Sequence, residues 1–213
     1  SGALILPVEK DNTNTKVHES DDDMDADDVP VIICDYSGSM RGENLMMQQT
    51  LVTNISSRFE TIRLILFNDQ VFYDKTIASY DVPRTLEKYS NNLGGTQLNE
   101  VFRYITREEI REAMLITDDQ VCGKLEYPNC KLHCVGIGKY ITTENIKALT
   151  EVTGGSYTTI KSVNTLPTAE KFVVALLGSS FHYPTRLIGQ SPHGEVDLHM
   201  HFLHQGTPTI LCY

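Results

Sequence analysis

The sequence predicts an α/β fold, a doubly wound, Rossmann-like sheet that is mostly parallel, with one antiparallel edge strand and helices on both faces. Short apolar runs alternate with amphipathic stretches from residue 29 to residue 177. This alternation is typical of parallel strands joined by right-handed crossovers. The first run, residues 29–34, is rich in β-branched residues, as expected of a strand buried on both faces. It ends in a polar turn at residues 35–39, the kind of position where open α/β sheets bind ligands.

Strand and helix signals follow one another closely in the next part of the chain. Residues 41–59 carry an apolar stripe at the helical period, which predicts a helix. Residues 61–67 form a second apolar strand. After a short polar turn at residues 68–70, residues 71–77 alternate as a strand that folds back antiparallel at the sheet edge.

The middle of the chain contains two further strands and one helix. Residues 78–92 are polar and include Pro83, so we expect them to be irregular. Apolar residues at the spacing of one helix face predict a helix over residues 98–105. Residues 113–117 and 132–137 are apolar runs and are predicted to be buried strands.

The pattern closes with a helix, an edge strand and a last helix. Residues 142–152 form a predicted helix that a glycine pair stops. Residues 156–161 are polar enough for an edge strand. Residues 165–177 form the last helix, with Thr165 as its cap and Gly178 just after its end.

The chain divides into three segments. Residues 1–28 are an acidic leader, expected to be flexible because its run of aspartates repels itself. Residues 29–178 form the α/β domain. Residues 179–213 are a C-terminal extension in which residues 196–202 alternate as a strand, with residues 209–213 as its hairpin partner. The extension ends without a polar tail, which is compatible with a piece cut from a longer protein.

The composition excludes some classes of partner. The 213 residues carry a formal charge of −10, which argues against nucleic acid as the main partner. No apolar run is long enough to cross a bilayer, so no membrane insertion is expected. Because the five cysteines cannot all pair within the chain, a reducing compartment and a cytoplasmic location are favoured. A secreted or surface protein whose signal has been removed is the alternative.

Three predicted loops carry hydroxyl and carboxylate groups at the ends of strands. Asp35, Ser37 and Ser39 follow the first strand, Thr96 follows a glycine pair, and Asp118 follows the strand at residues 113–117. The predicted sheet brings these distant segments to one edge. Oxygen ligands without a cluster of histidine or cysteine suit a hard cation, Mg²⁺ first, with Mn²⁺ or Ca²⁺ as alternatives.

Over residues 29–177 the sequence resembles the von Willebrand factor type A (VWA) family. The metal-ion-dependent adhesion site of that family has the pattern Asp-x-Ser-x-Ser, then a threonine, then an aspartate. The residues that match in order are Asp35, Ser37, Ser39, Thr96 and Asp118. The resemblance implies that the serines bind the metal through their hydroxyls and that Thr96 binds directly or through a water. Asp35 and Asp118 would mainly hold metal-bound waters.

The same resemblance implies a function. If few carboxylates touch the ion, its positive charge is poorly neutralised, and an Asp or Glu of a partner protein can replace a bound water. We therefore expect a divalent-cation-dependent protein-binding module. The family often has glycine where this chain has Asp119, so Asp119 is a candidate modulator that tightens metal binding or repels an acidic ligand.

Two other classes of function stay open. One is a structural or assembly subunit, as in ATPase-associated complexes, with a structural metal. The other is a metal-dependent phosphotransferase of the haloacid dehalogenase type. That family usually needs an aspartate two residues after the first, where this chain has Ser37. No catalytic constellation is recognised, so we expect no enzyme activity.

A second metal site is a further candidate in the C-terminal extension. His199, His201 and His204 are close in sequence, and two of them point to one face of the predicted strand. Imidazole ligands suit Zn²⁺ or Ni²⁺. The favoured interpretation is nevertheless a solvated strand face.

Overall fold

The computed structural model describes residues 29–118, 125–141, 143–180, 185–191, 194–202 and 208–210, with side chains as far as residue 177. The central feature is a six-stranded sheet in the order β3-β2-β1-β4-β5-β6. Its strands are β1 Val31–Asp35, β2 Thr61–Phe67, β3 Val71–Ala78, β4 Glu112–Thr117, β5 Lys131–Ile137 and β6 Tyr157–Ile160. Only β3, at one edge, runs antiparallel to its neighbour. The predicted fold class is confirmed.

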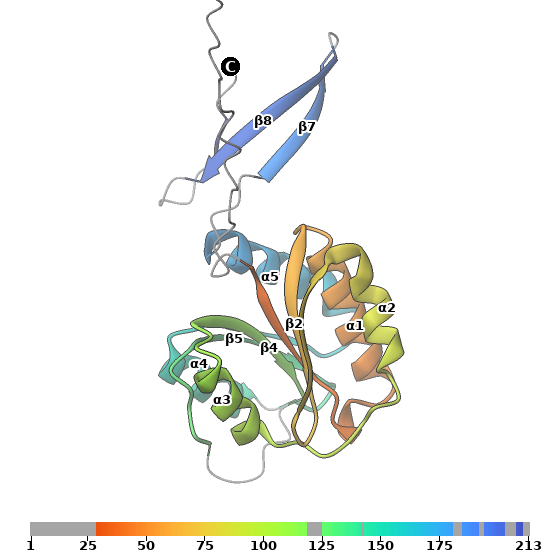
Figure 1. The fold of residues 1–213 in the computed structure, drawn as a ribbon, viewed down its shortest axis with the longest axis vertical. Coiled ribbons are helices and arrows are strands. Elements are labelled where there is room, and N and C mark those ends of the chain that lie inside the picture. Colours follow the sequence, from red (N-terminus) through yellow and green to blue (C-terminus); the bar gives the residue numbers. More distant parts are fainter. Residues whose placement is uncertain are drawn as a thin grey trace, which may run out of the picture.

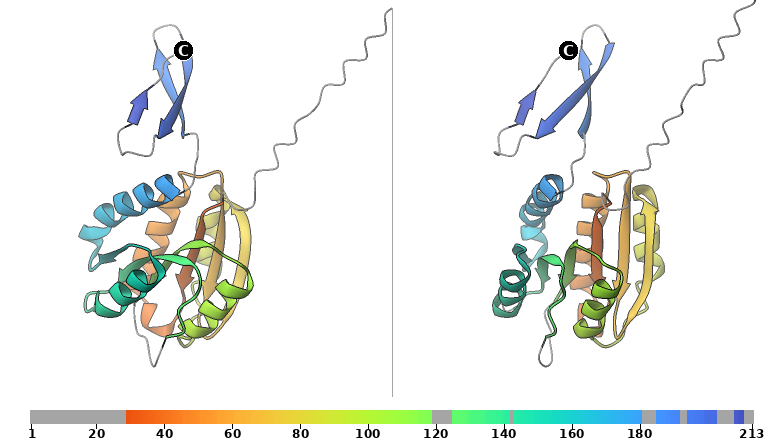
Figure 2. Two further views of the ribbon diagram at one scale, coloured as in Figure 1. Left: turned by 90° about the vertical axis from the view of Figure 1, so that its left-hand side faces the viewer. Right: turned by 60° about the vertical axis from the view of Figure 1, so that its left-hand side comes forward.

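Helices cover both faces of this sheet (Figures 1 and 2). The α-helices are α1 Glu43–Ser56, α2 Val82–Lys88, α3 Leu98–Arg107, α4 Thr143–Thr153 and α5 Leu166–Ser180. Within the described residues, three short 3₁₀ helices accompany them: η2 Gly38–Met40, η3 Ser79–Asp81 and η4 Val163–Thr165. Because successive side chains of a strand point to opposite faces, β1 contributes to two cores. Ile32 and Cys34 pack with α1, α2 and α5, whereas Ile33 packs with α3 and α4.

Two expectations about helices were wrong. Residues 78–92 are not irregular, because they contain η3 and α2. Pro83 lies in the first turn of α2, where its missing N–H costs nothing, and buried Val82 and Leu86 anchor that helix. Gly178 does not end the last helix, since α5 continues through it to Ser180.

The C-terminal extension contains a separate antiparallel sheet of three strands. These are β7 Thr185–Ser191, β8 Gly194–Phe202 and β9 Pro208–Ile210, in the order β7-β8-β9. The sequence predicted the β8–β9 pairing but missed β7. The extension therefore forms three strands in the structure, where two were expected. The acidic leader at residues 1–28 lies outside the described residues.

None of the helices in the described part of the chain combines the length and the apolar character that crossing a membrane requires.

Candidate metal site

The candidate site lies where the strand order reverses. The strand β1 is flanked by β2 on one side and by β4 on the other, both parallel to it. This is the switch point of a doubly wound sheet, where the crossover connections leave a crevice beside the strand ends. The register pairs Cys34 with Ile116, so that Asp35 and Thr117 lie at adjacent strand ends.

Asp35 is fully buried and its carboxylate is held on both oxygens. Its Oδ1 accepts a hydrogen bond of 2.7 Å from the backbone N–H of Ser37. Its Oδ2 accepts one of 2.7 Å from the hydroxyl of Thr117. Gln48, on α1, donates to the backbone carbonyl of the same aspartate at 2.8 Å. These bonds fix the carboxylate at the end of β1.

The electrostatics of Asp35 follow from its burial. Desolvation raises the pKa of Asp35 to about 6, and the nearby negative charge of Asp118 adds to the rise. Hydrogen bonds from Thr117 and Ser37 act in the opposite direction, because they favour the charged carboxylate. Two carboxyl groups thus approach each other closely enough to interact, which a cation placed between them would relieve.

The two serines meet on the turn after β1. The hydroxyl oxygens of Ser37 and Ser39 are 3.0 Å apart and share a hydrogen bond. Ser37 is buried and Ser39 half-buried. The 3₁₀ helix η2 brings both hydroxyls to the same side of the turn, so the Asp-x-Ser-x-Ser motif is already folded into one cluster.

The loop that carries Thr96 lies along this turn. The backbone of Gly94 accepts a hydrogen bond of 2.7 Å from the N–H of Gly38 and donates one of 3.1 Å to the carbonyl of Tyr36. The pairing is a short parallel bridge between Ser37 and Gly94. Thr96 is half-buried and two residues beyond the bridge.

Asp118, just after β4, has an unusual carboxylate. The residue is 8% exposed, and its buried Oδ1 has no hydrogen-bond partner within the described part of the chain. A buried carboxylate oxygen without a partner costs free energy, so it usually marks a bound water or ion. This oxygen is the observation that best fits a cation at the site.

Comparison with known proteins points to one family. No family model matches the chain. The chain is 26% identical over 169 residues to a von Willebrand factor A domain-containing protein of Dictyostelium discoideum. That match covers 68% of this chain and 20% of the other, so the chain spans about a fifth of the curated relative.

Solved structures agree with this relative. BatB, a conserved hypothetical protein from Bacteroides thetaiotaomicron, matches with a TM-score of 0.58 and 16% identity over 71% of this chain and 98% of its own. A von Willebrand factor type A protein from Catenulispora acidiphila matches with a TM-score of 0.57 and 15% identity, over 86% of this chain and 53% of its own. The fold is that of a VWA domain. The Dictyostelium relative supports the same family.

The candidate donor set of this VWA-like fold consists of two carboxylates and three hydroxyls. Within the described residues, no group of three or more His, Cys, Asp or Glu side chains could hold a metal. The oxygen-only candidate set matches the ligand preference of Mg²⁺ or Mn²⁺.

Other predicted site residues lie outside the described part of the chain. Asp119 is not described, nor is His204. His199 and His201 belong to the backbone of β8, but their side chains are not described, so the second metal site stays a prediction.

Two residues that the sequence analysis missed, Thr117 and Gln48, hold Asp35 in the candidate site. Thr117 reads as the last residue of an apolar strand, and Gln48 as one polar position of an amphipathic helix. Their contacts with Asp35 depend on strand register and helix docking, which no short pattern carries. Buried polar residues inside otherwise apolar stretches were the available signal.

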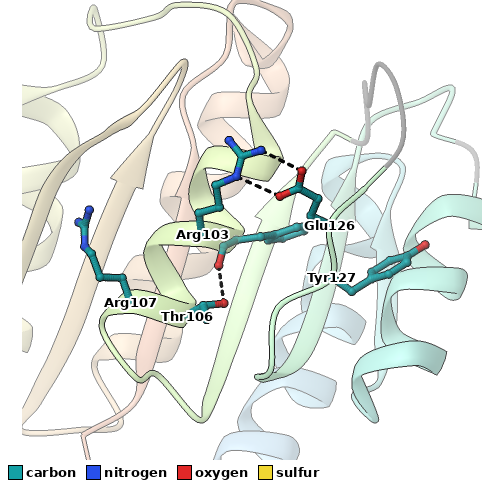
Figure 3. Close-up of a pocket in the computed structure, with 6 residues that line it drawn as sticks. Arg103, Thr106, Arg107, Glu126 and Tyr127 are labelled. Carbon is teal, nitrogen blue, oxygen red and sulfur yellow. Dashed lines mark hydrogen bonds and ion pairs between the residues drawn. The ribbon is translucent and has the colours of Figure 1, made fainter.

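A pocket of about 380 Å³ beside α3 is a weaker candidate (Figure 3). It lies between α3 and the segment before β5, and no predicted site residue lines it. Its Arg103 is bound by Glu126 at 2.8 and 2.9 Å and by Glu100 at 2.7 Å. The charge that could attract a ligand is therefore already neutralised within the protein.

Proposed function

We propose that this VWA domain is a divalent-cation-dependent protein-binding module. The cation, Mg²⁺ or Mn²⁺, would be held by Asp35, Ser37, Ser39, Thr96 and Asp118 at the carboxyl edge of the sheet. The observation that carries the proposal is the buried Oδ1 of Asp118, which has no hydrogen-bond partner among the described residues and whose carboxylate interacts with that of the buried Asp35.

The chemistry of the set supports binding over catalysis. Hydroxyl groups neutralise none of the cation's charge. With Asp35 and Asp118 acting mainly through metal-bound waters, the bound ion would retain affinity for an external anionic ligand. An Asp or Glu side chain of a partner protein supplies one oxygen and one negative charge. The module would then bind its partner through the metal without changing either molecule covalently.

The first experiment measures Mg²⁺ and Mn²⁺ binding by calorimetry on the full chain and on a Ser37→Ala, Ser39→Ala double variant. We expect the wild type to bind and the double variant to lose binding. The matched control is Ser56→Ala with Ser57→Ala, at the other end of α1, where both hydroxyls bond only carbonyls of their own helix. It should bind as the wild type does.

The second experiment tests the acidic partner. Peptides would be selected from a displayed library on the Mn²⁺-loaded domain and eluted with EDTA. The proposal predicts that selected peptides contain an Asp or Glu whose change to Asn or Gln abolishes binding. Peptides that stay bound through the EDTA elution and are recovered only by denaturation would instead favour an assembly subunit with a structural metal. Turnover of a generic phosphoester, lost in Asp35→Asn, would favour the phosphotransferase.

A further inference from the structure

The turn between β2 and β3 contacts the loop that carries Thr96. The backbone carbonyl of Asn68 accepts a hydrogen bond of 3.2 Å from the N–H of Gln97. The carboxylate Oδ2 of Asp69 accepts one of 3.1 Å from the N–H of Gly95. The two bonds therefore hold the residue before and the residue after Thr96.

The side chains of this turn also fill the space beside the glycine pair. A Cβ atom on Gly95 would collide with the carboxylate of Asp69, and one on Gly94 would lie 3.0 Å from the side chain of Asn68. The amide of Asn68 donates to the carbonyl of Asn92 at 3.2 Å. The glycines are thus required by close packing against the turn, and not only by the bend of their own loop.

The loop is held from two sides. Gly94 bonds the turn after β1, through Tyr36 and Gly38, while Gly95 and Gln97 bond the β2–β3 turn. Thr96 lies two residues after Gly94, the residue of the loop that bonds the turn after β1. Its position relative to Ser37 therefore depends on the second set of bonds.

From this arrangement we infer that Asn68 and Asp69 act as a clasp that sets the position of Thr96, with Asp69 as the positioning residue. The inference rests on the proposed metal site, of which Thr96 is a ligand. Mg²⁺ demands near-ideal octahedral geometry, so a hydroxyl that drifts weakens the site. Asp69 itself stays off the metal, because its carboxylate is bonded to the backbone of the loop.

The test compares Asp69→Ala, Asp69→Asn and Gln70→Ala on the full chain, with Mn²⁺ binding measured by calorimetry. Asp69→Ala removes the acceptor, and we expect a loss of about tenfold in affinity, as for other groups that orient metal ligands. Asp69→Asn keeps an oxygen acceptor and should lose about threefold or less, the effect of one exposed charge. Gln70→Ala, in the same turn, should bind as the wild type does.

A second readout does not need the metal. In EDTA, the backbone amide of Gly95 should exchange with deuterium faster in Asp69→Ala than in the wild type and Asp69→Asn. Unchanged exchange in Asp69→Ala, or an equal loss of Mn²⁺ affinity in Asp69→Asn and Asp69→Ala, overturns the clasp. If the wild type binds no Mn²⁺, the proposed function is wrong. The exchange experiment still tests the clasp in that case, because it needs no metal.

Discussion

The hydroxyl of Thr117 donates a hydrogen bond of 2.7 Å to Oδ2 of Asp35, although the two residues are 82 positions apart in the sequence. The bond joins the carboxyl ends of β1 and β4 beneath the candidate metal site. The bond also gives the buried carboxylate a hydrogen-bond donor, which offsets part of the free energy that its burial costs. The stability of the domain and the geometry of the site therefore depend on the same contact.

Replacement of Thr117 by Val keeps the shape of the side chain and removes its hydroxyl. We expect a loss of about 1–3 kcal/mol in the free energy of unfolding, because one buried carboxylate oxygen loses its donor. Urea denaturation in EDTA measures it. Thr150→Val is the matched control, since the buried Thr150 hydroxyl bonds only carbonyls of its own helix. An equal loss in both variants would contradict the special role of the Asp35 contact.

The raised pKa of Asp35 predicts how stability depends on pH. The ordinary pKa is 3.8 and the folded value is about 6, so the folded state holds the proton more tightly than the unfolded state. This group therefore favours folding below about pH 4, and its contribution is lost as the pH rises through 6. The loss amounts to about 3 kcal/mol.

The difference between wild type and Asp35→Asn isolates this effect from the other titrating groups. In EDTA, the free energy of unfolding of the wild type should decrease relative to that of Asp35→Asn between about pH 4 and about pH 7. Urea denaturation at several pH values measures the difference. A difference that does not change over this range would show that burial does not raise the pKa.

The proposed Mg²⁺ site predicts that any stabilisation by Mg²⁺ increases with pH. A protonated Asp35 cannot favour a cation, so below its pKa of about 6 the apparent Mg²⁺ affinity should fall by up to about tenfold for each pH unit. Thermal unfolding with and without Mg²⁺ measures this, because a ligand that binds only the folded state raises the melting temperature more when its concentration is higher relative to its Kd. Ser37→Ala with Ser39→Ala should show no Mg²⁺ effect at any pH.

Replacement of Gly95 by Ala should weaken Mn²⁺ binding, since the added methyl group meets the carboxylate of Asp69. Calorimetry on Gly95→Ala, Asp69→Ala and the double variant forms a cycle. If both changes act through the same contact, the double variant loses less binding free energy than the two single losses together. Strict additivity would mean that the methyl group disturbs Thr96 independently of Asp69.

Much of the fold was predictable because its signals are local. The apolar run at residues 61–67 coincides with β2, and the alternating run after it is β3 at the antiparallel edge. The helix α2 was missed because Pro83 reads as a breaker when its place in the helix is unknown. The end of α5 was misplaced because one glycine in a packed helix costs only about 1 kcal/mol, which burial of Val173 and Leu177 outweighs.

The site was predictable only in part, for a related reason. Its proposed ligands form a pattern along the chain, and a resemblance to the VWA family recognises such a pattern. The groups that hold those ligands, Thr117 and Asp69, act through register and loop packing between distant segments. Neither residue differs by type from any other threonine at a strand end or aspartate in a turn.

The order of the strands has a consequence for how the domain assembles. The strand β1 is the first strand of the sheet to leave the ribosome, yet one of its two neighbours, β4, follows only after β2 and β3. The hydrogen bond between Asp35 and Thr117 cannot form until β4 pairs with β1. That pairing joins segments far apart in the sequence, and such pairings form slowly. Cation binding in a refolding experiment should therefore appear late, as a signal that the centre of the sheet has closed.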